Sequence, residues 1–455
     1  MYETKTLREK IKLLIVILVP ILITQIGMYL MNFFDTIMAG QAGPDQLAGV
    51  AIGSNLWLPV FTGLNGIMMA ISPIVAQLKG ARQESEISSA VKQGVYLSIA
   101  IAIMIGLIGF LLLDPVLSLF TLEEEVRYVA KYYLITLGIG ILPLFVFNLL
   151  RSFIDALGQT KISMGIILMT LPANILFNYI FIFGKWGAPA LGGIGAGLAT
   201  ALTYWTACVI IIGVIHKMYP LRVYGIFSNW ITPSIKSWYE QLRIGIPIGF
   251  AIFFETSIFA AVTFFMTAYD TYTIAAHQAA INFASLVYMM PLSIAFALTI
   301  AVGFEVGANR LNAARTYSYL GISLSAGTSV LAGVILFVFD DTVARLYSSN
   351  EEVIELTKAF IFYAIFFQLS DGFGAPLQGI LRGYKDVNIT LLMAFVSYWV
   401  IGLPSGYLMA NYTPLGPFGY WMSLIIGLTA GAVTLWFRLL HLQHKKAKEG
   451  QALRA

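Results

Sequence analysis

Residues 249–265 read GFAIFFETSIFAAVTFF, an apolar stretch with one carboxylate, Glu255, near its middle. Two other apolar stretches have the same character: YLMNFFDTIMAG contains Asp35, and FIFYAIFFQLSDGFGAPLQG contains Asp371. All three belong to runs long enough to lie in a lipid bilayer, where a carboxylate near the centre is unfavourable by about 2.5 to 3.5 kcal/mol on insertion scales. A chain that keeps three such acids is expected to bind or move a cation.

The composition predicts a polytopic membrane protein. Hydrophobic residues make up 58% of the 455 positions and charged residues only 11%, whereas soluble domains contain about 25% charged residues. The polar N-terminus passes directly into an apolar span without a signal-peptide cleavage pattern, so this span is expected to stay in the protein. The single Cys208 and four scattered His residues do not indicate a disulfide, a cysteine-based metal site or redox chemistry.

Long, continuous apolar runs predict about twelve transmembrane helices and no barrel strands, which makes the fold an all-α polytopic membrane protein. The expected centres of the spans are Leu22, Phe61, Met104, Gly138, Leu176, Leu202, Ser257, Met290, Ala326, Phe367, Val400 and Leu428.

The distribution of basic residues predicts the topology. With a cytoplasmic N-terminus, 22 of the 27 Lys and Arg residues fall on the inner side, and the even number of spans puts both termini in the cytoplasm. The expected location is the cell membrane. The basic C-terminal tail needs only this explanation, and nucleic-acid binding is the disfavoured alternative.

Three short segments recur about 225 positions apart: QLKGAR as EVGANR, LGQTK as RGYKD, and LGGIG as LGPFG. Six predicted helices separate each pair, so the two halves share one orientation and are expected to form pseudo-symmetric six-helix bundles. The expected divisions are an N-terminal lobe at 1–215, a cytoplasmic connector at 216–242, a C-terminal lobe at 243–440 and a basic tail at 441–455.

In the tenth span Gln368, Asp371, Gln378 and Arg382 follow helical spacing along one side. Asp371 lies about 16 Å along the helix from Arg382, which is expected at the inner surface, and Glu255 is equally central in its own span. No basic side chain is expected in the neighbouring core to neutralise these acids, so each should be protonated, bind an ion or face water. A structural carboxylate hydrogen-bonded to a neighbouring helix is the alternative.

Asp35 shares a helical face with Gln25 and Asn32. In the fifth span Asn174 and Asn178 are four residues apart, a spacing that could bring their amides to the same cavity. A solvated Asp35 at the membrane interface, and Asn residues that only join helices, are the alternatives.

Tyr288 precedes Pro291 in a span expected to face the cavity, where an aromatic face beside carboxylates suits an organic cation. Packing in the core is the alternative for this residue.

Several motifs together make the chain resemble the multidrug and toxic compound extrusion (MATE) family, and within it the NorM-like branch. The similar segments cover nearly the whole chain, and they are MNFFDTIMAG, QLAGV, LPANILFNYIFIFG, LGGIGAGLATAL, FFETS, SLVYMMPLSIA and SDGFGAPLQGILRGYKD.

The resemblance implies two six-helix bundles, an alternating-access cavity, and export of cationic or amphipathic compounds against an inward flow of Na⁺ or H⁺. It implies a C-lobe sodium site at Glu255, Asp371 and Tyr288, with Glu255 and Asp371 as the metal ligands. It implies an N-lobe site at Asp35, Asn174 and Asn178. The expected substrate contacts are Asp35, Gln278, Gln25, Asn32 and Asp371.

The function expected from these features is a cation-coupled multidrug antiporter rather than an enzyme. No nucleotide-binding loop of the GxxxxGKS type is present, so ion gradients should supply the work. No cofactor is expected beyond the coupling ion, and the expected partners are small organic cations and membrane lipid, with no nucleic acid or obligate protein partner. The alternatives are a lipid-linked precursor flippase, which would favour a basic cavity, and an intramembrane hydrolase, which would need paired Asp residues.

Overall fold

The protein was analysed as a computed structural model, which describes residues 3–120 and 122–452. Every regular element among these residues is a helix. Eleven helices are long and apolar enough to cross a membrane, and a twelfth span is a helix pair bent by 51° between Glu124–Gly138 and Ile141–Ala156. The prediction of an all-α polytopic membrane protein with twelve spans is therefore confirmed. Eleven of the expected centres lie inside single helices, and the other, Gly138, is the last residue of the first helix of the bent pair.

The chain folds into two compact units, which are described separately. One unit contains residues 19–246, and the other contains the described parts of 1–18 and 247–455. Helices α1 and α9 each continue across a division, and both have a proline there, Pro20 and Pro247, which removes one backbone hydrogen bond from the helix. The expected lobe boundaries stay a prediction.

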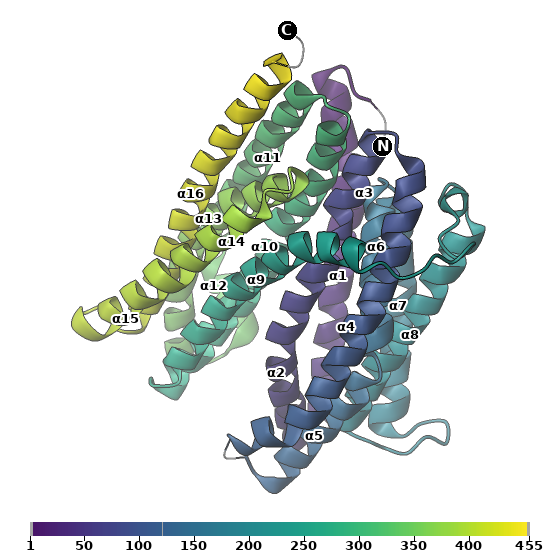
Figure 1. The fold of residues 1–455 in the computed structure, drawn as a ribbon. Helices are drawn as coiled ribbons and strands as arrows, with labels where there is room; N and C mark the ends of the chain where they lie inside the picture. The colour runs from purple at the N-terminus through teal and green to yellow at the C-terminus, as the bar shows by residue number, and fades with distance from the viewer. Residues whose placement is uncertain (1–2, 121, 453–455) are drawn as a thin grey trace. The chain divides into compact units, whose positions relative to one another are not determined.

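Unit 19–246 contains most of α1, helices α2 to α8, the short η1, and the beginning of α9 (Figure 1). Their bounds are α1 Leu7–Ala42, α2 Pro44–Met68, α3 Ile71–Gly80, α4 Glu84–Ser118, α5 Glu124–Gly138, α6 Ile141–Ala156, α7 Thr160–Phe183, α8 Gly193–Lys217, η1 Leu221–Tyr224 and α9 Ile235–Met266.

Helix α6 is the centre of the unit 19–246, because nearly all of its residues are buried. Phe145 and Phe153 lie in the main apolar cluster together with residues of α3, α4 and α8. A helix that is apolar on all sides must be surrounded by other helices. Helices α3, α4 and α8 therefore surround α6.

The segment predicted as a connector is held against α4 of the same unit. Lys92 donates through Nζ to the carbonyl of Ser228 at 2.7 Å, and Tyr96 donates through its hydroxyl to the carbonyl of Ile231 at 2.8 Å. The side chain of Leu221 is fully buried. The two hydrogen bonds satisfy backbone carbonyl groups of a segment that is not helical. Without a partner, such carbonyl groups would be unfavourable near a membrane.

The second unit contains the first turns of α1, the remainder of α9, and the elements that follow it. Their bounds are α10 Thr271–Gly307, α11 Leu311–Val338, α12 Asp340–Tyr347, α13 Glu351–Gly383, α14 Val387–Phe395, the π-helix η2 Val396–Gly402, α15 Leu403–Tyr412 and α16 Pro417–Ala452.

Helix α13 is the centre of this second unit, and its second half from Gly374 to Gly383 is continuously buried. Small residues allow α10 to approach closely, as expected for packed membrane helices. At Gly379 an added Cβ would lie 2.7 Å from Cα of Ala295, and the carbonyl of Gly379 accepts a hydrogen bond from Thr299 at 2.9 Å. The helix that carries Asp371, Gln378 and Arg382 is thus fixed by backbone contact with α10.

Replacement of this glycine should separate α10 from α13. Gly379→Ala places a methyl group against backbone atoms that cannot rotate away, and overpacking of this kind lowers the free energy of unfolding by about 1–3 kcal/mol. Fluorescence-monitored unfolding of the purified protein in detergent measures the change. Gly106→Ala in α4 is the matched control, because nothing lies within 4 Å of an added Cβ there. Equal stability of the two variants would contradict the close contact.

Candidate functional site

A first polar cluster surrounds Asp35 of α1 in unit 19–246. Its Oδ1 accepts hydrogen bonds from Nδ2 of Asn174 at 3.1 Å and from Nδ2 of Asn178 at 2.5 Å, both on α7. Its Oδ2 accepts a hydrogen bond from the Thr200 hydroxyl of α8 at 2.9 Å. Three donors from two neighbouring helices are therefore directed at one carboxylate, and all three are neutral.

The donors of this cluster are buried, with Asn178 fully inaccessible, while Asp35 itself is half-buried. Oδ1 of Asn178 has no hydrogen-bond partner among the described residues. None of the ion pairs in the described chain includes Asp35. A carboxylate held by neutral donors keeps the capacity to attract a cation, and a free amide oxygen beside it adds a further ligand.

Aromatic side chains lie next to this cluster. Tyr133 and Tyr204 both interact electrostatically with Asp35, and the Tyr133 hydroxyl lies 3.0 Å from that of Ser54. Two tyrosines are thus near enough to Asp35 to interact with its charge.

A second polar cluster surrounds Glu255 of α9 in the other unit. Its Oε1 accepts a hydrogen bond from the Tyr288 hydroxyl of α10 at 2.8 Å, and its Oε2 accepts one from Nε2 of Gln378 at 2.8 Å. Oε1 of Gln378 in turn accepts a hydrogen bond from Nη2 of Arg382 at 3.0 Å. The two α13 residues follow the spacing of four that places side chains on one helix face.

Asp371 lies on the same helix as Gln378 and is buried. Its carboxylate interacts electrostatically with that of Glu255, and no hydrogen bond to its side chain occurs among the described residues. Tyr398 of the π-helix η2 interacts with both acids and with Gln378. π-Helical turns often occur at functional sites, and here the turn carries a phenol beside two carboxylates.

Two carboxylates in one poorly hydrated space cannot both be charged without a cation or a proton. The oxygens of Glu255, Asp371 and the two tyrosines are hard donors of the type that binds alkali and alkaline-earth cations. In the described chain no three His, Cys, Asp or Glu side chains come together in the manner of a metal site. The pair of acids is chemically able to take up a cation or a proton.

Arg382 is buried, with 5% of its surface exposed, and it is joined to Glu255 through Gln378. Its expected place at the inner membrane surface stays a prediction. The guanidinium does not form an ion pair with either acid, because the amide lies between them. Glu255 is thus oriented by a relay that ends in a positive charge but is not neutralised by direct contact.

The structure brings together the ion-coupling residues expected in each half and leaves three expected substrate contacts outside both clusters. Gln25 is half-buried on α1 without a side-chain hydrogen bond to Asp35, and the side chain of Asn32 is exposed. Gln278 is exposed and donates to Oδ1 of Asn282 at 3.2 Å. Their expected role in substrate contact stays a prediction.

Two contributors were absent from the sequence prediction. Thr200 lies within the segment LGGIGAGLATAL, but only the packing of α8 beside α1 shows that its hydroxyl reaches Asp35. Tyr398 lies in an apolar stretch without a charged neighbour in sequence, so no local signal indicated it. Gln378 was part of the row of polar residues along one side of α13. This row indicated that its side chain faces the protein interior, where it contacts Glu255.

The comparison with known proteins agrees with this geometry. The family model described as MatE matches residues 20–180 and 247–408. The chain belongs to the MatE family. Each matched stretch begins where one structural unit gives way to the other, and the two starts are separated by about the offset of the predicted repeat.

Curated relatives of this MATE protein are similar over almost their full length. The "Probable multidrug resistance protein NorM" of Oceanobacillus iheyensis is 60% identical over 98% of this chain and 100% of its own. The protein of the same name in Bacillus subtilis is 54% identical over 99% of each chain. The MATE family consists of transporters rather than enzymes, and this chain is accordingly a multi-pass membrane transporter.

Solved MATE structures share the fold at low sequence identity. The crystal structure of the eukaryotic MATE transporter AtDTX14 has a TM-score of 0.87 at 21% identity, covering 98% of this chain and 99% of its own. An outward-facing multidrug resistance MATE transporter of the MOP superfamily has a TM-score of 0.85 at 19% identity, covering 100% of each chain. At these identities the likeness supports the twelve-helix fold alone.

Removal of Gln378 tests the relay at Glu255. Gln378→Leu leaves Oε2 of Glu255 and Nη2 of Arg382 without their partner, and a buried polar group that loses its hydrogen bond costs about 1–3 kcal/mol. The free energy of unfolding in detergent should fall by at least that amount. Gln278→Leu on the exposed side of α10 is the matched control and should change stability little. A neutral effect of Gln378→Leu would show that the relay does not form.

Proposed function

We propose that this MATE protein exports organic cations and amphipathic compounds across the cell membrane in exchange for Na⁺ or H⁺. The relatives named multidrug resistance proteins support the export of varied drugs. The observation that carries the coupling is the pair Glu255 and Asp371, two interacting carboxylates that are buried within membrane-spanning helices, with neutral donors on Glu255.

The coupling follows from the charge of this pair. With both acids ionised, the site carries two negative charges in a medium of low dielectric constant, which is strongly unfavourable. Entry of one Na⁺ or uptake of one proton removes one of these two charges. The inward movement of one charge across 100 mV releases about 2.3 kcal/mol, which is available for moving a drug outward.

The Asp35 cluster is the proposed contact for the exported cation. Its single carboxylate is half-buried and has aromatic neighbours, Tyr133 and Tyr204. A positively charged guest gains both charge attraction and an aromatic face there. The alternative within this proposal is that Asn174 and Asn178 help Asp35 to hold the coupling ion.

The proposed orientation puts both termini in the cytoplasm, since 22 of the 27 basic residues then lie on the inner side. A flippase for pyrophosphate-linked lipids is less well supported, because such a substrate would need direct contact with Arg and Lys. An intramembrane hydrolase is also less well supported, because it would use a pair of Asp residues, whereas Asp371 interacts with a Glu.

Removal of one negative charge from the pair should uncouple transport from the ion gradient. Glu255→Gln and Asp371→Asn should each lower gradient-driven efflux of a fluorescent organic cation by about tenfold or more, because the site with one charge fewer no longer requires a cation. The measurement uses proteoliposomes that receive a sodium jump in one series and a pH jump in another. A response to only one jump in the unaltered protein identifies the coupling ion.

Glu86→Gln and Asp45→Asn serve as matched controls, because both residues are exposed near helix starts and away from the clusters. They should transport like the unaltered protein. Membrane insertion is checked by the amount of folded protein recovered. Full efflux by Glu255→Gln and Asp371→Asn together would overturn the proposed coupling.

A further inference from the structure

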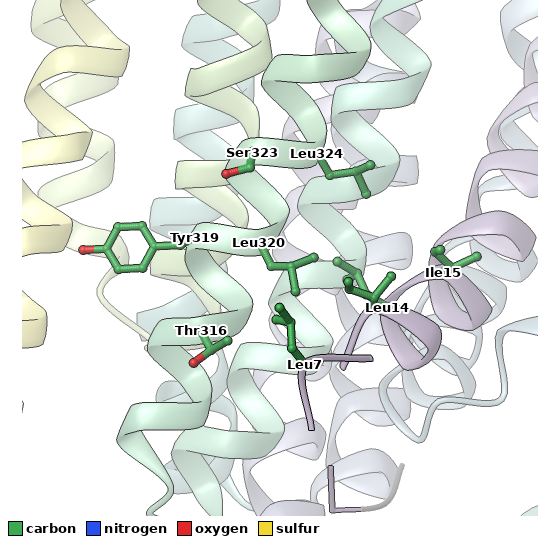
Figure 2. A pocket seen from close by; sticks show the side chains of 9 residues that line it. Leu7, Leu14, Ile15, Thr316, Tyr319, Leu320, Ser323 and Leu324 are labelled. Carbon is green, nitrogen blue, oxygen red and sulfur yellow. The ribbon is translucent and has the colours of Figure 1, made fainter. Parts of the chain in front are cut away.

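An apolar groove lies between the beginning of α1 and the middle of α11, both within the second unit. Residues of α1 that recur at helical spacing, Leu7, Ile11, Leu14 and Ile15, form one wall. Figure 2 shows Leu7, Leu14 and Leu320 directed into the space between the two helices. The groove has a volume of about 600 Å³, within the range of about 300–1,000 Å³ that is usual for small-molecule sites.

Polar contacts fix the two walls relative to each other. The Thr4 hydroxyl lies 2.9 Å from the hydroxyl of Tyr317, and both side chains are buried. Lys10 donates through Nζ to the carbonyl of Thr4 at 2.7 Å and lies 5.5 Å from the centre of the Tyr317 ring. The spacing of the two helices is therefore set by contacts beside the groove.

The outer side of the groove consists of apolar side chains that no other part of the described unit covers. Leu7 is 58% exposed and Ile15 is 45% exposed. In a membrane protein such a surface contacts hydrocarbon. An acyl chain is thus the occupant that matches the lining.

Positive charges accompany this apolar surface. Arg8 lies on the same side of α1 as Ile15, two turns away. Arg315 lies 5.5 Å from the ring of Tyr319, which forms the edge of the groove further from α1 (Figure 2). Arg8, Lys12 and Arg315 are exposed, and none of them forms an ion pair among the described residues. The nearby Glu9 is engaged elsewhere, since its carboxylate accepts from the backbone amide of Lys5 at 2.8 Å.

We propose that this groove is a binding site for one anionic phospholipid. The acyl chain lies along the leucine and isoleucine side chains of α1 and α11, and the phosphate is attracted by Arg8 and Arg315. Basic side chains beside membrane helices attract anionic head groups in this manner, and these lipids are concentrated in the cytoplasmic leaflet, where the N-terminus is proposed to lie. An exported organic cation is a poor occupant because the same arginines repel it.

Native mass spectrometry of the purified full-length protein tests the site. The protein is titrated with phosphatidylglycerol in one series and with phosphatidylcholine of the same acyl chains in another. Phosphatidylglycerol should bind more tightly, and the double variant Arg8→Gln with Arg315→Gln should weaken its binding about fivefold for each charge removed. Phosphatidylcholine binding should change little, because it depends on the apolar wall.

The double variant Lys161→Gln with Lys217→Gln is the matched control, because it removes the same charge from exposed positions of the other unit. It should bind phosphatidylglycerol like the unaltered protein. Leu320→Trp, which fills the groove, should reduce the binding of both lipids. A phosphatidylglycerol with a photoreactive acyl chain should label peptides that contain Leu7–Ile15 or Thr316–Leu324.

Three outcomes would overturn the proposal. One is equal affinity for the two lipids in the unaltered protein, and another is an equal loss of affinity in both double variants, which would indicate attraction to the whole basic surface. The third is displacement of the bound lipid by tetraphenylphosphonium, which would make the groove a site for organic cations. The arginine variants change only exposed side chains, so the test does not depend on whether Leu320→Trp folds.

Discussion

The low dielectric constant of the membrane interior is the constraint on which the two polar clusters depend. A buried carboxylate there needs donors, a counter-charge or a proton. In both units the chain supplies mainly neutral donors: amides and a hydroxyl at Asp35, and a phenol and an amide at Glu255. Neutral donors hold a carboxylate in place without cancelling its charge. The surrounding helices are accordingly arranged to deliver these donors, as the close contact of α10 with α13 at Gly379 illustrates.

The internal repeat explains why there are two clusters but does not make them equivalent. The family model matches the chain twice, from residue 20 and from residue 247, and the structural units divide at nearly the same positions. Within this repeated plan, α1 contributes Asp35 and α9 contributes Glu255, so corresponding first helices carry the acids. The partners then differ: α7 supplies two amides in one unit, whereas α13 supplies a second acid, Asp371, in the other. The two clusters therefore share the first helix of each half, but their other partners come from helices that do not correspond, because α7 is the fifth span of the first half and α13 is the fourth span of the second.

Much of the fold followed from the sequence because apolar length alone predicts membrane spans. The bend at Gly138 was not predicted, since a break of two residues leaves the apolar run continuous. At the sites, helical spacing correctly grouped Asn174 with Asn178, and Gln378 with Asp371, because residues on one helix face need no knowledge of tertiary structure. The places of Thr200 and Tyr398 and the burial of Arg382 depend on how separate helices pack, and no local sequence pattern indicates that. Gln25 and Asn32 show that helical spacing can also mislead. They share a helix face with Asp35, but their side chains do not hydrogen-bond to it.

The difference in charge between the clusters also limits what each can do. A single carboxylate with three neutral donors gains at most one positive charge before it is neutral, so an organic cation and an inorganic ion compete there for the same place. Two carboxylates with phenols and an amide remain negative after one proton has bound, so this site can still attract a second cation. Arg382 adds to this distinction, because it interacts electrostatically with Glu255 and is joined to it by hydrogen bonds through Gln378. Under the proposed function, one site of each kind gives the protein a physical basis for holding the drug and the coupling ion at different places, which two identical sites would lack.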